Sequence, residues 1–179
     1  MAAFPHRLAQ PDDLAALRAV MERAIATLQH GFLTPEQIAA SHRVMGLDTQ
    51  LITDQTYFLV EDTDGTIAGC GGWSYRATLY GGDASIVARA PQRLDPARDA
   101  AKIRAMYTNP DHTRRGIGRR ILGLCENAAR DAGFARAEMM ATMAGVPLYQ
   151  ACGYRPVEPV LSAPIDGVQV PLVRMEKHL

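Results

Sequence analysis

Hydrophobic residues recur along the chain at two spacings, and these divide it into predicted helices and strands. Apolar positions three and four residues apart predict helices over 14–28, 35–46 and 116–131, and a short one over 147–152. Apolar runs rich in β-branched and aromatic residues predict strands at 4–8, 56–61, 66–73, 101–108, 134–141, 154–161 and 168–175. This order is typical of an α+β domain, in which helices pack on a mixed sheet.

Turn and capping residues support these boundaries. Asp64-Gly65 predicts a hairpin turn between two strands, and Thr34 with Gln37 predicts a capping box at the start of the second helix. The segment 76–98 has scattered prolines, glycines and charges instead of a period, so we expect a long connection with scope for function. The sequence contains no repeat, low-complexity tract or linker, and we predict one domain over residues 1–179.

Composition and charge argue against several function classes. Lys and Arg number 19, as do Asp and Glu, so the net charge of zero predicts neither a nucleic acid nor a membrane surface as partner. Cys70, Cys125 and Cys152 lack disulfide or metal-ligand spacing, which indicates reduced, buried thiols and no metal site. Residues 1–13 lack the apolar core of a signal peptide, and no apolar run reaches the roughly 18 residues of a membrane span. We therefore expect a cytoplasmic protein.

The stretch 111–120 is chemically unusual for the start of a helix. Gly116 and Gly118 let the backbone approach a ligand closely, and the helix that follows offers free N–H groups. Four arginines and no acid lie between Arg114 and Arg120, although the N-terminal end of a helix repels cations. A solvated cationic face over an ordinary turn is the alternative, but it leaves that repulsion uncompensated. The pattern predicts a phosphate-bearing ligand at this helix end.

Two stretches resemble motifs of one enzyme family. The run from Thr108 to Gly118 resembles motif A of the GCN5-related N-acetyltransferases (GNAT), which binds the pyrophosphate of acetyl-coenzyme A. The run from Thr142 to Tyr154 resembles the family's motif B. One predicted helix and one predicted strand separate the two runs, as in the family. The resemblance implies a mostly antiparallel mixed sheet flanked by helices, in the order βααβββαβαββ.

The chain departs from the family pattern at three positions. Thr113 stands in place of the usual Arg or Gln, Thr142 in place of Asn, and Gly145 in place of Ala. A phosphate contact that Thr113 cannot make would then fall to Arg114 or Arg115. These departures bear on the affinity for the cofactor.

The resemblance assigns roles to individual residues. It implies that the pyrophosphate binds to residues at the start of the helix, namely Arg114, Arg115, Gly116, Ile117, Gly118 and Arg119. It also implies that Met106, Tyr107 and Thr108 offer backbone groups to the pantetheine arm. Tyr149 then lies near the sulfur and protonates the departing thiolate, a role that suits a phenol with a pKa near 10. Without the motif, Tyr149 reads as a packing residue.

The general base and the acceptor pocket are less well defined. Glu61, Glu138 and His112 (expected in an exposed loop) are candidate bases, but a surface role is favoured for each and no base is assigned. Pocket candidates are His30 with Phe32, and Trp73 with Tyr75, against a simple turn and core packing respectively. In segment 76–98, Arg89, Arg93 and Arg98 would favour an acidic substrate, although a solvated loop is the simpler reading.

The sequence therefore predicts an acetyl-CoA-dependent N-acetyltransferase. A small-molecule or peptide amine would attack the thioester directly and form a tetrahedral intermediate. One alternative is a catalytically silent acyl-CoA sensor. The other is a dinucleotide-binding domain, which is disfavoured because Ile121 stands where that fingerprint wants Gly or Ala. Homodimers are common in the family, but no segment here decides the oligomeric state.

Overall fold

A single twisted sheet forms the centre of the molecule. The computed structural model describes residues 4–179. Of the stretch 1–13, which the sequence analysis compared with a signal peptide, residues 1–3 therefore lie outside the described part. Seven strands pair in the order β1-β2-β3-β4-β5-β7-β6, and every neighbouring pair is antiparallel except β4 and β5. The strands are β1 (His6–Leu8), β2 (Tyr57–Glu61), β3 (Ile67–Ser74), β4 (Ala101–Thr108), β5 (Arg136–Thr142), β6 (Arg155–Leu161) and β7 (Pro171–His178). The predicted mixed, mostly antiparallel sheet is confirmed.

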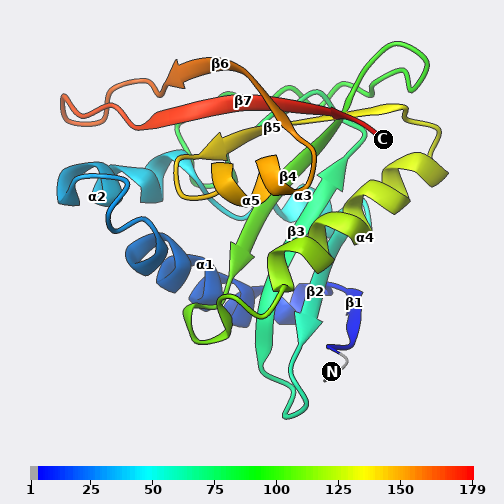
Figure 1. Cartoon of the computed structure of the whole chain (residues 1–179), viewed down its shortest axis with the longest axis horizontal. Coiled ribbons are helices and arrows are strands. Elements are labelled where there is room, and N and C mark those ends of the chain that lie inside the picture. The colour runs from blue at the N-terminus through cyan, green and yellow to red at the C-terminus, as the bar shows by residue number, and fades with distance from the viewer. Residues whose placement is uncertain (1–3) are drawn as a thin grey trace.

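The helices lie on both faces of this sheet (Figure 1). They are α1 (Leu14–Leu28), α2 (Pro35–Val44), α3 (Thr49–Thr53), α4 (Ile117–Asp131) and α5 (Val146–Ala151), with 3₁₀ turns η1 (Pro11–Asp13) and η2 (Pro110–His112). The predicted capping box is present, since Thr34 Oγ1 accepts from Gln37 N at 3.2 Å and Gln37 Oε1 accepts from Thr34 N at 3.1 Å. The sequence analysis missed α3 and both 3₁₀ turns, and it placed the starts of β1, β5 and β7 two to three residues early.

Two hydrophobic clusters fill the space between sheet and helices. One cluster includes Val60 of β2 and the buried face of α4, and the other includes Leu59 of β2 and the buried face of α1. Adjacent residues of β2 thus enter different clusters, as the alternation of side chains along a strand requires. The cysteines are all free. Cys70 and Cys125 are buried as predicted, whereas Cys152 is only half-buried.

Helix α4 lies close against β3 because β3 carries glycine beneath it. A Cβ atom on Gly69 would come within 2.6 Å of Ile117 Cγ2, and one on Gly71 within 2.7 Å of Ile121 Cγ2. Side chains at these positions would push the helix outward. The two glycines therefore fix the depth at which the start of α4 sits over the sheet.

Strands β4 and β5 separate soon after they meet. They pair only at Ala101↔Ala137 and Lys102↔Glu138, and from there the ribbons diverge (Figure 1). The last six residues of β4 therefore have no partner on that side within the described chain. This divergence opens the middle of the sheet.

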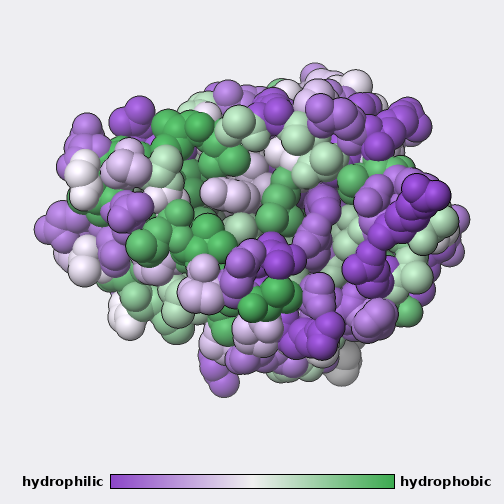
Figure 2. Space-filling model, turned by 90° about the horizontal axis from the view of Figure 1, so that it is seen from above, coloured by the Kyte–Doolittle hydropathy of each residue, from purple (hydrophilic) through white to green (hydrophobic). Residues whose placement is uncertain are grey.

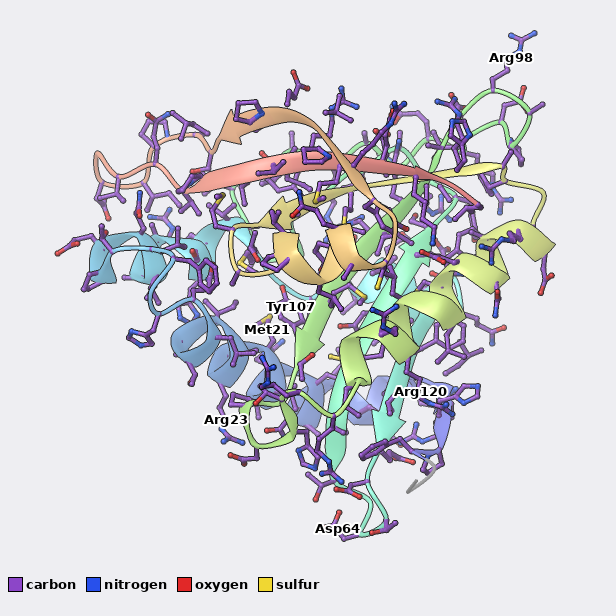
Figure 3. All side chains as sticks on the ribbon, in the orientation of Figure 1. Met21, Arg23, Asp64, Arg98, Tyr107 and Arg120 are labelled. Carbon is purple, nitrogen blue, oxygen red and sulfur yellow. The ribbon has the colours of Figure 1, made fainter. Side chains whose placement is uncertain are left out.

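Segment 76–98 crosses one end of the sheet without regular structure, as predicted. It is tied down by an isolated bridge between Arg76 and Arg93, while Arg98 projects away from the molecule (Figure 3). Between residues 4 and 179, no helix has the length and apolar character needed to cross a membrane. Figure 2 shows polar and apolar residues mixed over the face seen from above, with apolar ones gathered toward the left.

Candidate active site

Two cavities meet where β4 and β5 diverge. The larger, about 740 Å³, runs past the end of β4 and the start of α4, and the smaller, about 80 Å³, lies toward α2 and segment 76–98. The residues that line both cavities are Met45, Met106, Tyr107, Thr142 and Tyr149. Three of these are residues that the sequence analysis assigned to the site. The divergence of the strands thus creates one passage with a large and a small end.

The turn before α4 is held in a fixed conformation. Asn109 caps η2 by accepting from Asp111 N at 3.1 Å, and it donates to Ile67 O at 3.0 Å. Arg23 reaches from α1 to this turn and pairs with Asp111 Oδ2 at 3.0 Å (Figure 3). Arg114 then adopts a left-handed φ of 59°, which stores strain in the segment that leads into the helix.

The start of α4 leaves backbone donors free. Gly116 is the N-cap residue, no side chain caps the helix, and the first turn carries no acid. The first hydrogen bond of the helix runs from Arg120 N to Gly116 O at 3.0 Å, so the preceding N–H groups have no partner within the helix. These donors lie at the larger cavity, which Gly116, Ile117, Gly118 and Arg119 line. Free N–H groups at the start of a helix are the type of donor that binds anions.

The two glycines of the motif serve different purposes. Gly116 has a φ of +80°, and a Cβ atom built on it meets nothing within 4 Å, so the space above it is open. A Cβ on Gly118 would lie 2.7 Å from Leu148 Cδ2 of α5. Gly116 therefore meets a backbone requirement beside an open cavity, and Gly118 permits α4 and α5 to pack closely.

The four arginines of the motif separate into two pairs. Arg114 and Arg119 line the larger cavity. Arg115 instead pairs with Asp62 at 3.0 Å and lies over the ring of Phe4, with 4.6 Å between its Cζ and the ring centroid. Arg120 contacts His6 Nδ1 at 3.2 Å. Arg115 and Arg120 do not line the cavity, so the positive charge directed into it is smaller than the sequence suggests.

His112 is buried, which corrects the expectation of an exposed position. Its Nε2 lies 3.0 Å from Asp62 Oδ2, while its Nδ1 is buried without a partner among the described residues. Hydrogen bonds from Thr63 N and then from Arg115 and His112 lower the pKa of Asp62 to about 2. Asp62 is therefore an anion that contacts both Arg115 and His112, and His112 lines the larger cavity.

A bulge shapes β4 at the junction of the cavities. Cys70 of β3 faces Tyr107, but Gly72 faces Arg104, so Ala105 and Met106 together face Gly71. Ala105 has a φ of 49°, and Tyr57 Oη donates to its carbonyl at 2.8 Å. A bulge leaves an unpaired residue in the ladder and increases the local twist. Here it places Met106 and Tyr107 at the junction.

Tyr149 lies at the junction, and residues on both sides of it fix its ring. The ring packs edge-on against Tyr154, with centroids 6.2 Å apart, and a Cβ on Gly145 would lie 2.7 Å from its Cε2. The departure to Gly145 thus makes room for this ring. Thr142 Oγ1 accepts from Gly145 N at 3.2 Å and so holds the turn before α5. Within residues 4–179, the structure records no hydrogen-bond partner for the Tyr149 hydroxyl.

Of the three candidate bases, His112 lines the larger cavity, and the two glutamates lie away from the junction. Glu61 binds Arg7, and Glu138 forms ion pairs with Lys102 and Arg174. In the described chain, neither cavity has an Asp or Glu in its lining. The structure therefore offers no carboxylate as general base.

The pocket candidates also lie elsewhere. His30 and Phe32 are exposed, and Phe32 keeps 51% of its surface accessible. Trp73 packs against Phe134 in the core, and Tyr75 lies under Arg76 and Arg93. The residue that the sequence analysis missed here is Gln29, the C-cap of α1. Gln29 is 3% exposed, lines the larger cavity, and has a buried Oε1 without a partner among residues 4–179.

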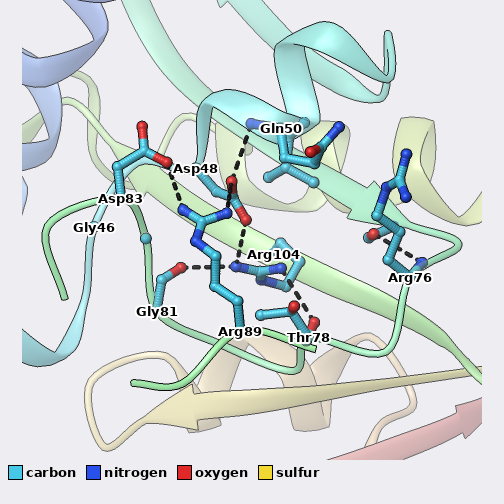
Figure 4. A network of polar contacts seen from close by, with 12 residues as sticks. Gly46, Asp48, Gln50, Arg76, Thr78, Gly81, Asp83, Arg89 and Arg104 are labelled. Carbon is cyan, nitrogen blue, oxygen red and sulfur yellow. Dashed lines mark hydrogen bonds and ion pairs between the residues drawn. The ribbon is translucent and has the colours of Figure 1, made fainter. Parts of the chain in front are cut away.

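Among residues 4–179, the charged side chain that lines the smaller cavity is that of Arg104. Arg104 is 3% exposed and donates to Asp48, Thr78 O and Gly81 O (Figure 4). Sequence reasoning missed it, although an arginine inside the apolar run 101–108 was a signal that could have been used. Of the arginines it did propose near the acceptor, Arg89 pairs with Asp48 and Asp83, and Arg98 is exposed.

Comparison with known proteins identifies the family. The sequence model of the acetyltransferase (GNAT) family matches residues 18–154. The chain belongs to this family. As a GNAT protein it has the N-acetyltransferase fold that the sequence analysis anticipated, and the match spans both motifs. No curated protein matches the chain.

Solved structures agree with this assignment to the GNAT family. A GCN5-related N-acetyltransferase from Rhodopseudomonas palustris has a TM-score of 0.70 at 17% identity, covering 100% of this chain and 98% of the other. The PaiA N-acetyltransferase from Thermoplasma acidophilum, solved with coenzyme A, has a TM-score of 0.63 at 15% identity, covering 99% of both chains. A ribosomal-protein-alanine N-acetyltransferase from Brucella melitensis has a TM-score of 0.65 at 16% identity, covering 98% and 99%. At these identities the likeness concerns the fold.

Proposed function

We propose that this GNAT protein transfers the acetyl group of acetyl-CoA to a primary amine by direct attack. The observation that carries the proposal is the meeting of two cavities at the unpartnered hydroxyl of Tyr149. The large cavity runs from the junction to the free N–H groups at the start of α4, and the small one suits an acceptor. A family relative solved with coenzyme A supports the choice of cofactor.

The residues of the large cavity suit the parts of acetyl-CoA. The free N–H groups at Gly116 to Arg119 would bind the pyrophosphate, and Arg114 and Arg119 would supply charge-assisted hydrogen bonds. Met106, Tyr107 and Thr108 line the cavity toward the junction, where the β5 side of β4 has no strand partner. Their backbone groups are thus available to an amide-bearing chain.

The chemical step needs a proton donor at the junction. The acceptor nitrogen forms a bond to the acetyl carbonyl carbon, the carbon–sulfur bond breaks, and the nitrogen loses one proton to solvent. Tyr149 donates its phenolic proton to the departing sulfur and regains one from water. Burial raises the pKa of Tyr149 above its ordinary value of 10, so the phenol holds its proton until the thiolate forms.

Calorimetric titration with acetyl-CoA tests the cofactor assignment, with NADH as the comparison ligand. We expect acetyl-CoA to bind and NADH not to bind. Arg119→Glu places an anion at the start of α4 inside the large cavity and is expected to weaken binding by about tenfold or more. Arg120→Glu is the matched control, because Arg120 contacts His6 outside the cavity.

Two outcomes would contradict the proposal. Equal weakening by Arg119→Glu and Arg120→Glu would show a general charge effect and remove the pyrophosphate from this helix end. Binding of acetyl-CoA without acetylation of any amine in a broad panel would instead identify a silent acyl-CoA sensor.

A further inference from the structure

The small cavity is the place for the acceptor if the proposed function holds. It shares Tyr149, Met106 and Thr142 with the large cavity, so a molecule bound in it reaches the junction directly. Its volume of about 80 Å³ is far below the 740 Å³ of the cofactor side. The acceptor group that enters it is therefore small.

Aliphatic and thioether side chains line this cavity together with the hydroxyl-bearing residues Tyr80, Tyr107, Tyr149 and Thr142. The aliphatic and thioether side chains that line it are Val44, Met45, Leu79, Ile103, Met106, Met139, Met140 and Leu172. In the part of the chain that the structure describes, no carboxylate lines it to attract an ammonium group. A polycationic acceptor would lose its hydration there without an anion to replace it. The lining thus favours an aliphatic group.

Arg104 is the charged residue of this lining within the described chain, and its hydrogen bonding is incomplete. Its Nη1 donates to Thr78 O at 3.1 Å, and its Nη2 donates to Asp48 Oδ2 at 3.0 Å and to Gly81 O at 2.7 Å. Its Nε is buried and has no partner in residues 4–179. A buried N–H without an acceptor is unfavourable, and a ligand oxygen would satisfy it.

The charges around Arg104 form a network of two guanidinium groups and two carboxylates. Asp48, its one buried acidic partner, is shared with Arg89, whose Nη1 lies 2.7 Å from Asp48 Oδ1 (Figure 4). Asp83 and Arg89 pair at the rim, where 44% and 38% of their side chains are exposed, so Arg104 is the buried cation of the network. Two guanidinium groups thus share one buried carboxylate. Burial lowers the pKa of Arg104, and the neighbouring Asp48 acts against this shift.

We propose that the acceptor is a free amino acid with an aliphatic side chain, whose carboxylate binds Arg104. The proposal rests on the proposed function. The carboxylate accepts from Arg104 Nε, the aliphatic group contacts the Met and Leu side chains, and the amine faces the junction at Tyr149. A peptide N-terminus has an amide where this site offers a cation, so it is the disfavoured acceptor.

Matched acceptors test this on the unmodified protein. Leucine, leucinamide and 3-methylbutylamine share one side chain and one amine, and only leucine carries a carboxylate. We expect kcat/KM for leucine to exceed that for each of the other two by about tenfold or more, as for a charge-assisted hydrogen bond. Equal or better use of leucinamide would overturn the proposal and indicate a peptide acceptor.

A substitution of Arg104 tests whether this residue causes the preference for an acceptor with a carboxylate. Arg104→Lys keeps the charge but removes the Nε–H, so kcat/KM for leucine is expected to fall about tenfold more than kcat/KM for 3-methylbutylamine. A purely structural role would lower both values equally, which would contradict the assignment. Arg93→Lys is the control, because Arg93 lies over the ring of Tyr75 and lines neither cavity.

The two proposals fail in different ways. If acetyl-CoA does not bind in the calorimetric titration, the proposed function fails. If acetyl-CoA binds and an amine without a carboxylate is acetylated best, only the assignment of the acceptor fails.

Discussion

At the scale of the residue, the hydroxyl group of Tyr149 differs from those of Tyr57 and Tyr107 in what it binds. The Tyr57 hydroxyl donates to Ala105 O at 2.8 Å, and the Tyr107 hydroxyl bonds both N and O of Gly46 at 3.0 Å. These two hydroxyl groups therefore hold the backbone at Ala105 and Gly46 in place. The Tyr149 hydroxyl lies at the junction of the cavities with no partner among residues 4–179, which leaves it available to a reacting group.

Removing this hydroxyl should slow the reaction and leave cofactor binding intact. We expect Tyr149→Phe to lower kcat by about ten- to a thousandfold, the range of a general acid, with the Kd for acetyl-CoA within about threefold of the original. Steady-state kinetics and calorimetry measure the two. Tyr154→Phe is the control, because this neighbouring ring lines neither cavity. An unchanged kcat in Tyr149→Phe would remove the phenol from the mechanism.

The pH dependence of kcat should reflect the burial of Tyr149. Burial disfavours the phenolate and raises the pKa of Tyr149, so the group stays protonated as the pH rises. A pH–rate profile is therefore expected to show no alkaline fall below about pH 10. An alkaline fall below that pH which disappears in Tyr149→Phe would mean that the phenol ionises early, contrary to the structure.

At the scale of the element, the bulge of β4 and the position of α4 depend on Gly71. A Cβ there would lie 2.3 Å from Met106 Sδ and 2.7 Å from Ile121 Cγ2. We expect Gly71→Ala to lower the free energy of unfolding by about 1–3 kcal/mol through overpacking. The same variant should raise KM for acetyl-CoA, because Met106 lines both cavities.

Gly123 in α4 provides the matched comparison. A Cβ on Gly123 meets nothing within 4 Å, so Gly123→Ala is expected to raise the free energy of unfolding by about 0.5–1 kcal/mol through helix propensity alone. Urea denaturation measures both variants. Equal stability of the two alanine variants would contradict the view that close packing of β3 against α4 requires glycine at position 71.

Elements with a strong period were predictable, and those defined by contacts were not. Strand Ala101–Thr108 agrees with its predicted bounds, and helix α4 does within one residue, because α4 is amphipathic and the strand is an apolar run. Helix α3, with five residues, is too short to show a period. The bulge was not predictable either, since alanine rarely adopts the positive φ of Ala105.

The candidate site was predictable where local chain chemistry defines it. The glycine-rich start of α4 and Tyr149 follow from motifs, and the structure brings both to the cavities. The direction of Arg115 toward Asp62 and the burial of His112 depend on a hairpin some 50 positions away, so no local pattern contains them. The same holds for Arg104, whose partner Asp48 is 56 positions distant.

At the scale of the whole molecule, buried thiol and phenol groups limit the alkaline stability. Burial raises the pKa of Cys70 to about 12, and it also raises those of Cys125, Tyr57 and Tyr107. The folded chain therefore keeps protons that the unfolded chain releases near its own pKa values of about 8.5 for Cys and 10 for Tyr. Stability is present in full below the unfolded-state values and is lost as the pH rises above them.

Urea unfolding as a function of pH measures this effect. We expect the denaturation midpoint to fall progressively above about pH 9. Cys70→Ala should reduce the slope of this decline, whereas Cys152→Ala, at a half-buried position, should change it less. A midpoint that rises above pH 9 would contradict the direction of the shifts.

The divergence of β4 and β5 also makes a mechanical seam through the molecule. Two residue pairs join the strands β1 to β4 to the strands β5 to β7, where a continuous sheet would have a full ladder. A ligand that lies along the cleft touches both halves, so its binding energy also joins them. Amide hydrogen exchange in β5 and β7 should then slow when acetyl-CoA binds. The bound cofactor would connect the two halves where the strands β4 and β5 are not paired.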